Sequence, residues 1–461
     1  MPVIETPASR PGSAIPAATR QMAAAIRDAR FTRLPAPVAL YLLCILIPVG
    51  FNVGPLAITA LRLLLMVMII PLTIRLISGG LGRVFATDIL FILHILWATV
   101  ALAVNNPAQV VQQVGSVGVE FIGGYLLARA YVRTPEVFIA LCKWLVILVC
   151  LMVPLALYEA WTGRPLLIEI LHKFSLTPVA IVTTPGRMGL ERVQAVFAHP
   201  IHFGLFCSVV FSLSFVALKG IVGTGWRYAS SFIIAFSGLL ALSSGALLAI
   251  ALQIALILWS SIFARVQHRW WLLVALFAAA YVIIDIFSNR TPLKVFMTYA
   301  TFSAHTAYWR SIIFEWGMKS VWSNPFVGIG LRDWVRPLYM RSGSMDNFWL
   351  VIAVRYGIPG FLFVVSGYAL AVFSILRQDF TKSVLLTQIR RAWIFTFLGL
   401  SFTLCTVHIW TNIYSFVFFM FGCGIWLVKA APSEHPEATT YPEQTGNSHR
   451  NGIQYSRFPV K

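Results

Sequence analysis

The sequence predicts an all-α polytopic membrane protein with about twelve transmembrane helices. Of its 461 residues, 59% are hydrophobic and only 11% are charged, a composition far more apolar than that of soluble domains. The hydrophobic residues fall in repeated runs of about 20, the length that a helix needs to cross a bilayer. The net charge of +19 comes from basic residues between these runs, where they orient membrane helices, so it does not indicate a nucleic-acid partner.

The predicted helices follow one another within a transmembrane domain over residues 38–430, the first beginning two residues earlier. In order, they are 36–51, 55–77, 86–104, 110–131, 137–160, 195–219, 226–242, 244–264, 270–288, 345–376, 391–411 and 412–430. The first and the seventh are short for a spanning helix.

The charges between these segments predict their orientation. Short connections on one side are basic, as at Arg75 and Arg83, whereas the short connections 105–109 and 242–245 on the other side contain no Lys or Arg. Because positive residues are retained in the cytoplasm, we expect both termini there. Residues 1–37 have no apolar segment of a signal peptide and are expected to be a cytoplasmic tail. Residues 431–461 are polar and are expected to be a disordered cytoplasmic tail.

The two long connections, 161–194 and 289–344, lie on the outer side in this topology. Loops of such length are uncommon unless they have a function, and both are basic. Their cationic residues are Arg164, Lys173, Arg187 and Arg192 in the first, and Arg290, Lys294, Arg310, Lys319, Arg332, Arg336 and Arg341 in the second. They predict an anionic ligand at the outer face. The alternative is that they only solvate the loops or contact lipid headgroups.

Part of the second loop has a helical pattern. In residues 308–323 the apolar side chains of Trp309, Ile312, Ile313, Trp316 and Val321 share one helix face. Two basic residues of the segment, Arg310 and Lys319, are expected on other faces, and Asn324-Pro325 is expected to end the helix. We therefore predict an amphipathic helix at the outer interface, in a long and partly helical loop between helices nine and ten.

The segment SMDNFWLVIAVRYGIPG, residues 344–360, contains candidate site residues. Asp346 is expected to open the tenth helix, either as its N-cap or as a catalytic carboxylate, and Asn347 to hydrogen-bond locally. Arg355 comes about 13 Å further along the helix, where a charge needs a partner. Glu120, Asp285 or a bound anion are the candidates, and a purely structural ion pair is an equal alternative.

A second informative segment is RVQAVFAHPIHFG, residues 192–204. Arg192 stands at the outer end of the sixth helix, and Pro200 after His199 is expected to weaken that helix at its start. His199 and His202 could share one face. Because no third ligand is near in sequence, we expect them to form hydrogen bonds in the core, and we expect no metal site.

Further polar groups are candidates at this end of the bundle. The turn at Ser243-Ser244-Gly245 would either contact an anion through its amides or allow close helix packing, and His408 and Asn412 are possible rim groups. The six cysteines all lie in apolar runs without CxxC spacing, which indicates neither disulfides nor zinc. No phosphate-binding loop, dinucleotide fingerprint, zinc-protease motif or nucleophile elbow is present, so we expect no cofactor.

Four segments carry a resemblance to a known family: 192–204, 243–249, 309–334 and 344–360. Together they resemble the O-antigen ligase and Wzy-type polymerase superfamily of bacterial envelope polysaccharide assembly. The resemblance implies about a dozen helices, a large periplasmic loop between late helices and location in the bacterial inner membrane. It also implies a metal-independent glycosyltransferase whose donor is an undecaprenyl-diphosphate-linked glycan, with other polysaccharide assembly proteins as further candidate partners.

One position separates this chain from the ligases. Ligases have a His-Asn pair where this chain has Asp346-Asn347, and the Asp-Asn form is more similar to the exopolysaccharide polymerase branch. The resemblance therefore implies a polymerase of lipid-linked repeat units. The expected catalytic residues are Asp346, Arg192, Arg310 and Arg336, and the expected substrate-binding residues are Arg332, Arg355, His199, Asn347, Trp309 and Trp334.

Three alternatives remain. The nearest is a ligase that transfers a finished glycan to lipid A core. A transporter of lipid-linked sugars should show two related halves with broken helices at corresponding positions, and the asymmetric long loops argue against it. The third is a scaffold protein without catalytic activity in the same assembly complex.

Overall fold

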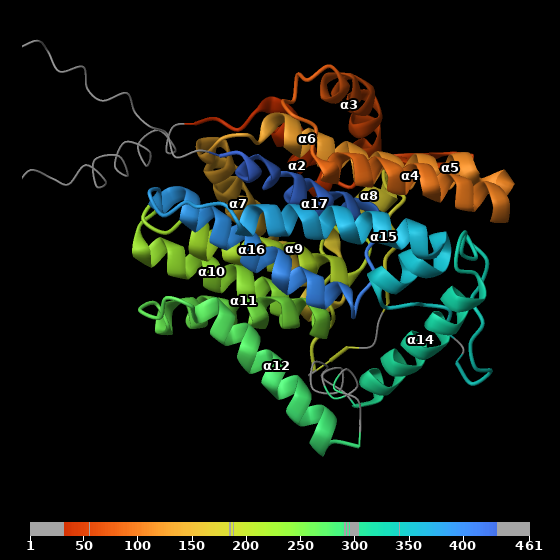
Figure 1. The fold of residues 1–461 in the computed structure, drawn as a ribbon. Coiled ribbons are helices and arrows are strands. Elements are labelled where there is room, and N and C mark those ends of the chain that lie inside the picture. The colour runs from red at the N-terminus through yellow and green to blue at the C-terminus, as the bar shows by residue number, and fades with distance from the viewer. Residues whose placement is uncertain are drawn as a thin grey trace, which may run out of the picture.

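The computed structural model describes residues 32–54, 56–183, 186–187, 189–289, 292, 295, 304–340 and 342–430. Both predicted tails, except for a few residues next to the membrane domain, lie outside these ranges. Within them the chain is almost entirely helical, and Figure 1 shows α4, α9, α15 and α16 running in nearly the same direction through the bundle, with α12 and α14 inclined to it.

The helices are α2 (Ala36–Leu46), α3 (Ala60–Ile77), α4 (Ala86–Asn105), α5 (Val110–Gly118), α6 (Gly124–Tyr131), α7 (Pro135–Thr162), α8 (Leu166–Lys173), α9 (Pro200–Ser212), α10 (Thr224–Leu240), α11 (Ser244–Ile262), α12 (Arg269–Phe287), α14 (Ala304–Ser323), α15 (Phe348–Leu376), α16 (Val384–Leu404) and α17 (Thr411–Gly422). π-Helical turns at Val119–Gly123 and Leu213–Ala217 interrupt two of the spans, and 3₁₀ turns occur at Pro107–Gln109 and Ile425–Val428. The strands β1 (Gly50–Val53) and β2 (Leu56–Thr59) form an antiparallel hairpin.

The all-helical, polytopic membrane class is confirmed. In the described part of the chain, nine helical stretches are long and apolar enough to cross a membrane. They begin at Ala60, Ala86, Pro107, Pro135, Pro200, Ser244, Arg269, Phe348 and Thr411. The other three predicted segments coincide with α2, α10 and α16, of which α2 has 11 residues and α10 has 17. Twelve spans therefore stay a prediction.

Several predicted helix boundaries were wrong by five residues or more. The second helix begins at Ala60, after strand β2, and not at 55, and the eleventh is α16 (Val384–Leu404) and not 391–411. The first helix ends at Leu46, and the chain then enters the β-hairpin. The sixth begins at Pro200 and not near residue 195, because proline has no backbone N–H to continue a helix toward its N-terminus. The preceding residues form an anchored loop, described below.

The core lies among α6, α9, α16 and α17, whose side chains are mostly buried. By contrast, α12 has no buried residue and is apolar between Arg269 and Asp285, which stand near its two ends. A helix that is apolar on all sides and unburied within its own chain is typical of a lipid-facing span. Its distance from the bundle in Figure 1 agrees with this interpretation.

The helix α15 is broken at Gly357, which adopts φ 72° and ψ −178°. The broken backbone receives the segment after α14, because Ile329 N donates to Val354 O (2.9 Å), Gly330 N donates to Arg355 O (3.0 Å) and Ile358 N donates to Pro325 O (2.7 Å). The end of α4 supports the same segment, since Asn106 Oδ1 accepts from Leu331 N at 2.8 Å. Two of the motifs that carry the family resemblance, 309–334 and 344–360, are thus joined by backbone hydrogen bonds.

Replacing Gly357 with Ala is expected to destabilise the protein strongly. A Cβ at this position would overlap the carbonyl oxygen of Phe326, and the backbone conformation alone costs a side-chain-bearing residue about 1–3 kcal/mol. Thermal unfolding of the purified protein in detergent measures the effect. Gly115→Ala is the matched control because nothing lies within 4 Å of its Cβ position. Equal midpoints for the two variants would show that the break in α15 is not required.

Candidate functional site

Four helices begin close together at one end of the bundle: α9, α11, α15 and α17. Phe348 N, at the start of α15, donates to Val407 O at 3.0 Å. The rings of His202 and Trp410 are 4.1 Å apart, which joins the starts of α9 and α17. At the start of α11, Gly245 O accepts from Thr403 Oγ1 at 3.1 Å. Helix N-termini carry partial positive charge, but α10 (Thr224–Leu240) and α16 (Val384–Leu404) end at the same side with the opposite partial charge. The charge of this end therefore depends on its side chains.

The loop before α9 is fixed by a buried carboxylate. Glu159 of α7 is 2% exposed, and its two carboxylate oxygens accept hydrogen bonds from Gln194 N and Ala195 N, each at 2.8 Å. Val193 N also donates to Leu240 O at 3.2 Å. Because these contacts hold the backbone at 193–195, the neighbouring Arg192 is held in place as well.

Two arginines of this first long loop contact the turn between α10 and α11. Arg187 Nη1 donates to Leu242 O (2.8 Å), and Arg192 Nε donates to Ala241 O (3.4 Å). The carbonyl groups of the turn therefore orient two guanidinium groups. The amide groups of this turn, and not its carbonyl groups, were predicted from the sequence as candidate contacts of an anion. Burial, together with the charge of Arg187, lowers the pKa of Arg192 to about 10, so the Arg192 side chain is cationic at neutral pH.

Arg310 of α14 is the third arginine in this region. Its side chain is 8% exposed, and its Nε and Nη1 have no hydrogen-bond partner among the described residues. Burial lowers the pKa of Arg310. The Asp346 carboxylate raises this pKa and the Arg187 guanidinium lowers it, so Arg310 interacts electrostatically with both groups. The prediction that Arg310 lies away from the buried face of this helix was wrong. We call Arg187, Arg192 and Arg310 the arginine cluster.

A buried guanidinium with unused donors is unfavourable unless an anion pairs with it, because desolvation of an ion costs several kcal/mol. Arg187 also raises the local positive potential, because its charge interacts with those of Arg192 and Arg310. The arginine cluster is therefore a cationic site with free hydrogen-bonding capacity at Arg310. A bidentate or multidentate oxyanion such as a phosphate group fits this arrangement.

Asp346 lies beside the arginine cluster. Its carboxylate affects the pKa of both Arg310 and His199, and its Oδ1 accepts from Ser344 Oγ at 2.7 Å. The helix begins at Phe348 and its N-cap is Asn347, whose Oδ1 accepts from Leu350 N at 3.0 Å. Asp346 therefore does not cap α15, and its carboxylate is available for other contacts.

Replacing Asn347 with Ala is expected to lower the free energy of unfolding by about 1 kcal/mol, because the first turn of α15 loses its N-cap acceptor. Thermal unfolding in detergent is the measurement. Asn347→Asp should retain most of the stability, since aspartate is an equally good cap. An unchanged midpoint for Asn347→Ala would contradict the capping role.

The histidines lie on the opposite wall of the same region. His199 is the N-cap of α9, with Nδ1 accepting from Ile201 N at 3.1 Å. His202 is fully buried with neither ring nitrogen hydrogen-bonded to a described residue, so the expectation of core hydrogen bonds is wrong for it. Burial and the charge of Arg192 lower the pKa of His199 to about 4. Within the described ranges, no group of three His, Cys, Asp or Glu residues is placed to hold a metal.

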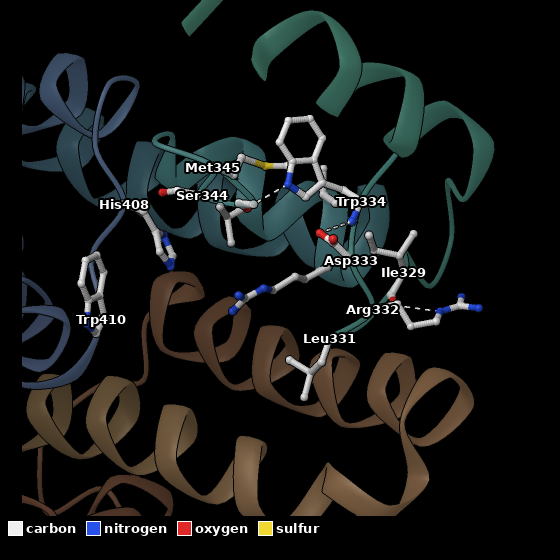
Figure 2. A pocket seen from close by; sticks show the side chains of 13 residues that line it. Ile329, Leu331, Arg332, Asp333, Trp334, Ser344, Met345, His408 and Trp410 are labelled. Carbon is white, nitrogen blue, oxygen red and sulfur yellow. Dashed lines mark hydrogen bonds between the residues drawn. The ribbon is translucent and has the colours of Figure 1, made fainter. Parts of the chain in front are cut away.

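Two predicted site arginines lie outside the cluster. Arg336 pairs with Asp333 and donates to Met340 O at 3.2 Å, so it ties together the chain before α15. Arg332 contacts Asn105 Oδ1, and Figure 2 shows it directed away from the pocket described next. The aromatic residues also have structural contacts. Trp334 Nε1 donates to Gly343 O at 2.9 Å, and the Trp309 ring lies 6.1 Å from that of Tyr339.

Arg355 has neither of its predicted carboxylate partners. Glu120 pairs with Arg62 at 2.8 Å, and Asp285 is exposed on α12. Arg355 instead lines a pocket of about 430 Å³ that also includes Ser344 and Met345, the residues before Asp346. Figure 2 shows this pocket. The pocket is lined by Ile329, Leu331, Arg332, Asp333, Trp334, Gly343, Ser344, Met345, Val351, Val354, Arg355, His408 and Trp410.

The fold and the arginine cluster thus define a polytopic membrane protein with a cationic site at one end of its bundle. Residues 229–365 match the family model described as O-antigen ligase, which confirms the resemblance to the O-antigen ligase and Wzy-type superfamily. The match spans Arg310, Asp346 and Arg355. No curated protein matches the chain.

The sequence prediction of the site omitted Arg187, Glu159 and Ser344. Arg187 had a usable signal, because it stands five residues before Arg192 in the same basic loop. Glu159 had a weaker one, as an acidic residue near the end of an apolar run. The local sequence gives no signal for Ser344. Its hydrogen bond to Asp346 depends on the conformation of the chain before α15.

Proposed function

We propose that this protein is a polymerase that joins undecaprenyl-diphosphate-linked oligosaccharide repeat units into a surface polysaccharide or exopolysaccharide. The observation that carries the proposal is the buried Arg310 guanidinium, which has two donors without a partner among the described residues and interacts electrostatically with Arg187 and the Asp346 carboxylate. An enzyme that releases a lipid diphosphate needs such a cationic group beside a base. The match to the O-antigen ligase family supports the same chemistry.

In the proposed reaction, a hydroxyl oxygen of the acceptor unit forms a bond with the anomeric carbon of the growing chain. The bond between that carbon and the diphosphate oxygen breaks, and undecaprenyl diphosphate leaves with the electron pair. The hydroxyl proton passes to Asp346 as general base. The arginine cluster stabilises the negative charge that develops on the leaving diphosphate.

The other predicted site residues have supporting roles in this proposal. His199, neutral because its pKa is lowered, adds a hydrogen-bonding ring near Asp346, and Asn347 fixes the start of α15. Arg336, predicted as catalytic, acts by holding the segment that bears Asp346. Arg332 and Trp309 stabilise the outer segments, and Trp334 and Arg355 line the pocket beside Asp346.

The proposed orientation places the loops 161–194 and 289–344 on the periplasmic face of a bacterial inner membrane, with both termini in the cytoplasm. The basic short connections on the other side support it under the positive-inside rule. The site then faces the compartment in which lipid-linked glycans are joined. No metal or cofactor takes part in the proposed reaction.

The test is reconstitution of the purified protein with a synthetic undecaprenyl-diphosphate oligosaccharide in liposomes. A ladder of products that grow by whole repeat units is the expected result. If the protein makes no ladder and instead transfers the glycan to added lipid A core, the ligase alternative is correct. Movement of the lipid-linked sugar between leaflets without any new glycosidic bond would identify a transporter.

A further inference from the structure

The pocket of about 430 Å³ is a second compartment, distinct from the arginine cluster. It is bounded by the chain from Ile329 to Trp334, the first turns of α15 and the link between α16 and α17. The two compartments share a wall. Ser344 and Trp410 line the pocket, while Ser344 Oγ donates to Asp346 and the Trp410 ring is 5.8 Å from that of His199. Asp346 therefore lies between a cationic site and a pocket.

The charged residues that line the pocket differ in whether they have a partner. Asp333 is offset by its ion pair with Arg336, and Arg332 points away from the pocket (Figure 2). Among the described residues, no carboxylate lies within salt-bridge distance of Arg355. His408 faces Arg355 and is neutral, because burial and the Arg355 charge lower its pKa to about 3. Of the two guanidinium groups in the lining, Arg332 donates to Asn105 Oδ1 and Ile329 O, and Arg355 interacts with the Tyr356 hydroxyl.

The rest of the lining fits a carbohydrate. Trp334 and Trp410 provide aromatic faces on opposite sides of the pocket, as Figure 2 shows, and sugar rings pack their C–H faces on such surfaces. The Asp333 carboxylate and the Ser344 hydroxyl provide acceptors for sugar hydroxyls. The volume lies within the range of small-ligand pockets. A lipid diphosphate is expected to prefer the cluster, which has three arginines, over this compartment, where Arg355 also interacts with the Tyr356 hydroxyl.

We propose that this pocket binds the acceptor glycan and selects a sugar that carries a carboxylate, such as a uronic acid, through Arg355. A guanidinium and a carboxylate make two parallel hydrogen bonds, which fixes the sugar ring as well as its charge. The ring is then held on the opposite side of Asp346 from the diphosphate, where its hydroxyl faces the general base. This role in acceptor choice rests on the proposed function, whereas the binding itself does not.

The experiment measures binding of free disaccharides to the full-length protein in detergent by saturation-transfer NMR titration. The probes are a methyl glycoside that contains glucuronate, its carboxyl-reduced glucose analogue, and a glucose 6-phosphate analogue, all without diphosphate. We expect the uronate to bind roughly 10- to 100-fold more tightly than the reduced sugar. Inorganic pyrophosphate, which fits the arginine cluster, should not displace it.

Arg355→Gln should abolish the difference between the uronate and the reduced sugar, and Arg355→Lys should retain part of it. Arg377→Gln, on the exposed far end of the same helix, is the matched control and should behave as the wild type. Thermal unfolding shows whether each variant is folded. If Arg355→Gln does not fold, the wild type and Arg355→Lys decide the question by their preference between the two sugars.

Equal binding of the uronate and the reduced sugar by the wild type would overturn the inference, as would absence of all sugar binding. A preference that survives in folded Arg355→Gln overturns it as well. Tighter binding of the phosphorylated sugar would show that the pocket selects a sugar phosphate and not a uronate, which also overturns the inference. These results are separable from the proposed function. Ladder formation with no uronate preference rejects only the pocket's role, whereas uronate binding without any ladder rejects only the polymerase.

Discussion

Arg310→Gln is expected to lower the rate of polymer formation by roughly 100- to 1000-fold, the usual cost of losing one preorganised donor to a developing negative charge. In the part of the chain that the structure describes, Nε and Nη1 of the buried Arg310 have no hydrogen-bond partner, and the guanidinium interacts electrostatically with the Asp346 carboxylate. Glutamine keeps hydrogen-bonding capacity but removes the charge. The measurement is the initial rate of ladder formation in liposomes at saturating lipid-linked substrate.

The stability of this variant should change in the opposite direction. Arg310 is buried, interacts with the like charge of Arg187, and has two nitrogens without a hydrogen-bond partner among the described residues. Its removal should therefore leave the unfolding midpoint unchanged or raise it. Lys319→Gln on the exposed face of α14 is the control and should keep full activity. A large fall in the Arg310→Gln midpoint with activity retained would mean that the arginine is structural.

Asp346→Asn is expected to reduce the rate by roughly 100- to 10,000-fold, the range for loss of a general base. The amide retains the shape of the side chain and can still accept from Ser344, but it cannot take a proton. Folding should be unaffected, because Asn347 and not Asp346 caps α15. Rates of ladder formation and unfolding midpoints of the same preparations provide both readouts.

Neighbouring positions provide the contrast for this prediction. Asp346→Glu should recover part of the activity, since it restores a carboxylate at a slightly different distance. Asn347→Ala should lower the unfolding midpoint more than the rate of ladder formation, whereas Asp346→Asn should lower the rate and leave the midpoint unchanged. If Asp346→Asn polymerises at the wild-type rate, the base is another residue, and His199 is then the nearest candidate.

The fold class was predictable because its cause is local. The length and spacing of apolar runs locate helices without any tertiary information, and each of the twelve predicted segments coincides with a helix. Boundaries were less predictable where tertiary contacts decide them. The loop at 192–199 stays out of α9 because Glu159, more than thirty residues earlier, binds its backbone amides. The break in α15 at Gly357 depends on the segment 325–330 docking there.

The site was predictable in part. Basic residues in long outer loops and the polar start of the tenth predicted helix pointed to Arg192, Arg310 and Asp346, which the structure brings close to one another. Helical periodicity placed Arg310 on the wrong face, because it cannot show that a charge is buried among other charges. The pairing of Arg336 with Asp333 and of Arg62 with Glu120 depends on chain folding. Nothing in the local sequence shows which cation is left without a carboxylate.

The central claim is that the arginine cluster holds a lipid-borne diphosphate beside Asp346. The most direct test is a structure of the protein in lipid nanodiscs with undecaprenyl diphosphate bound. We predict phosphate oxygens within hydrogen-bond distance of Arg310 and of Arg187 or Arg192, with the Asp346 carboxylate facing the diphosphate. A diphosphate bound elsewhere, with Arg310 still buried and out of contact with it, would contradict the account.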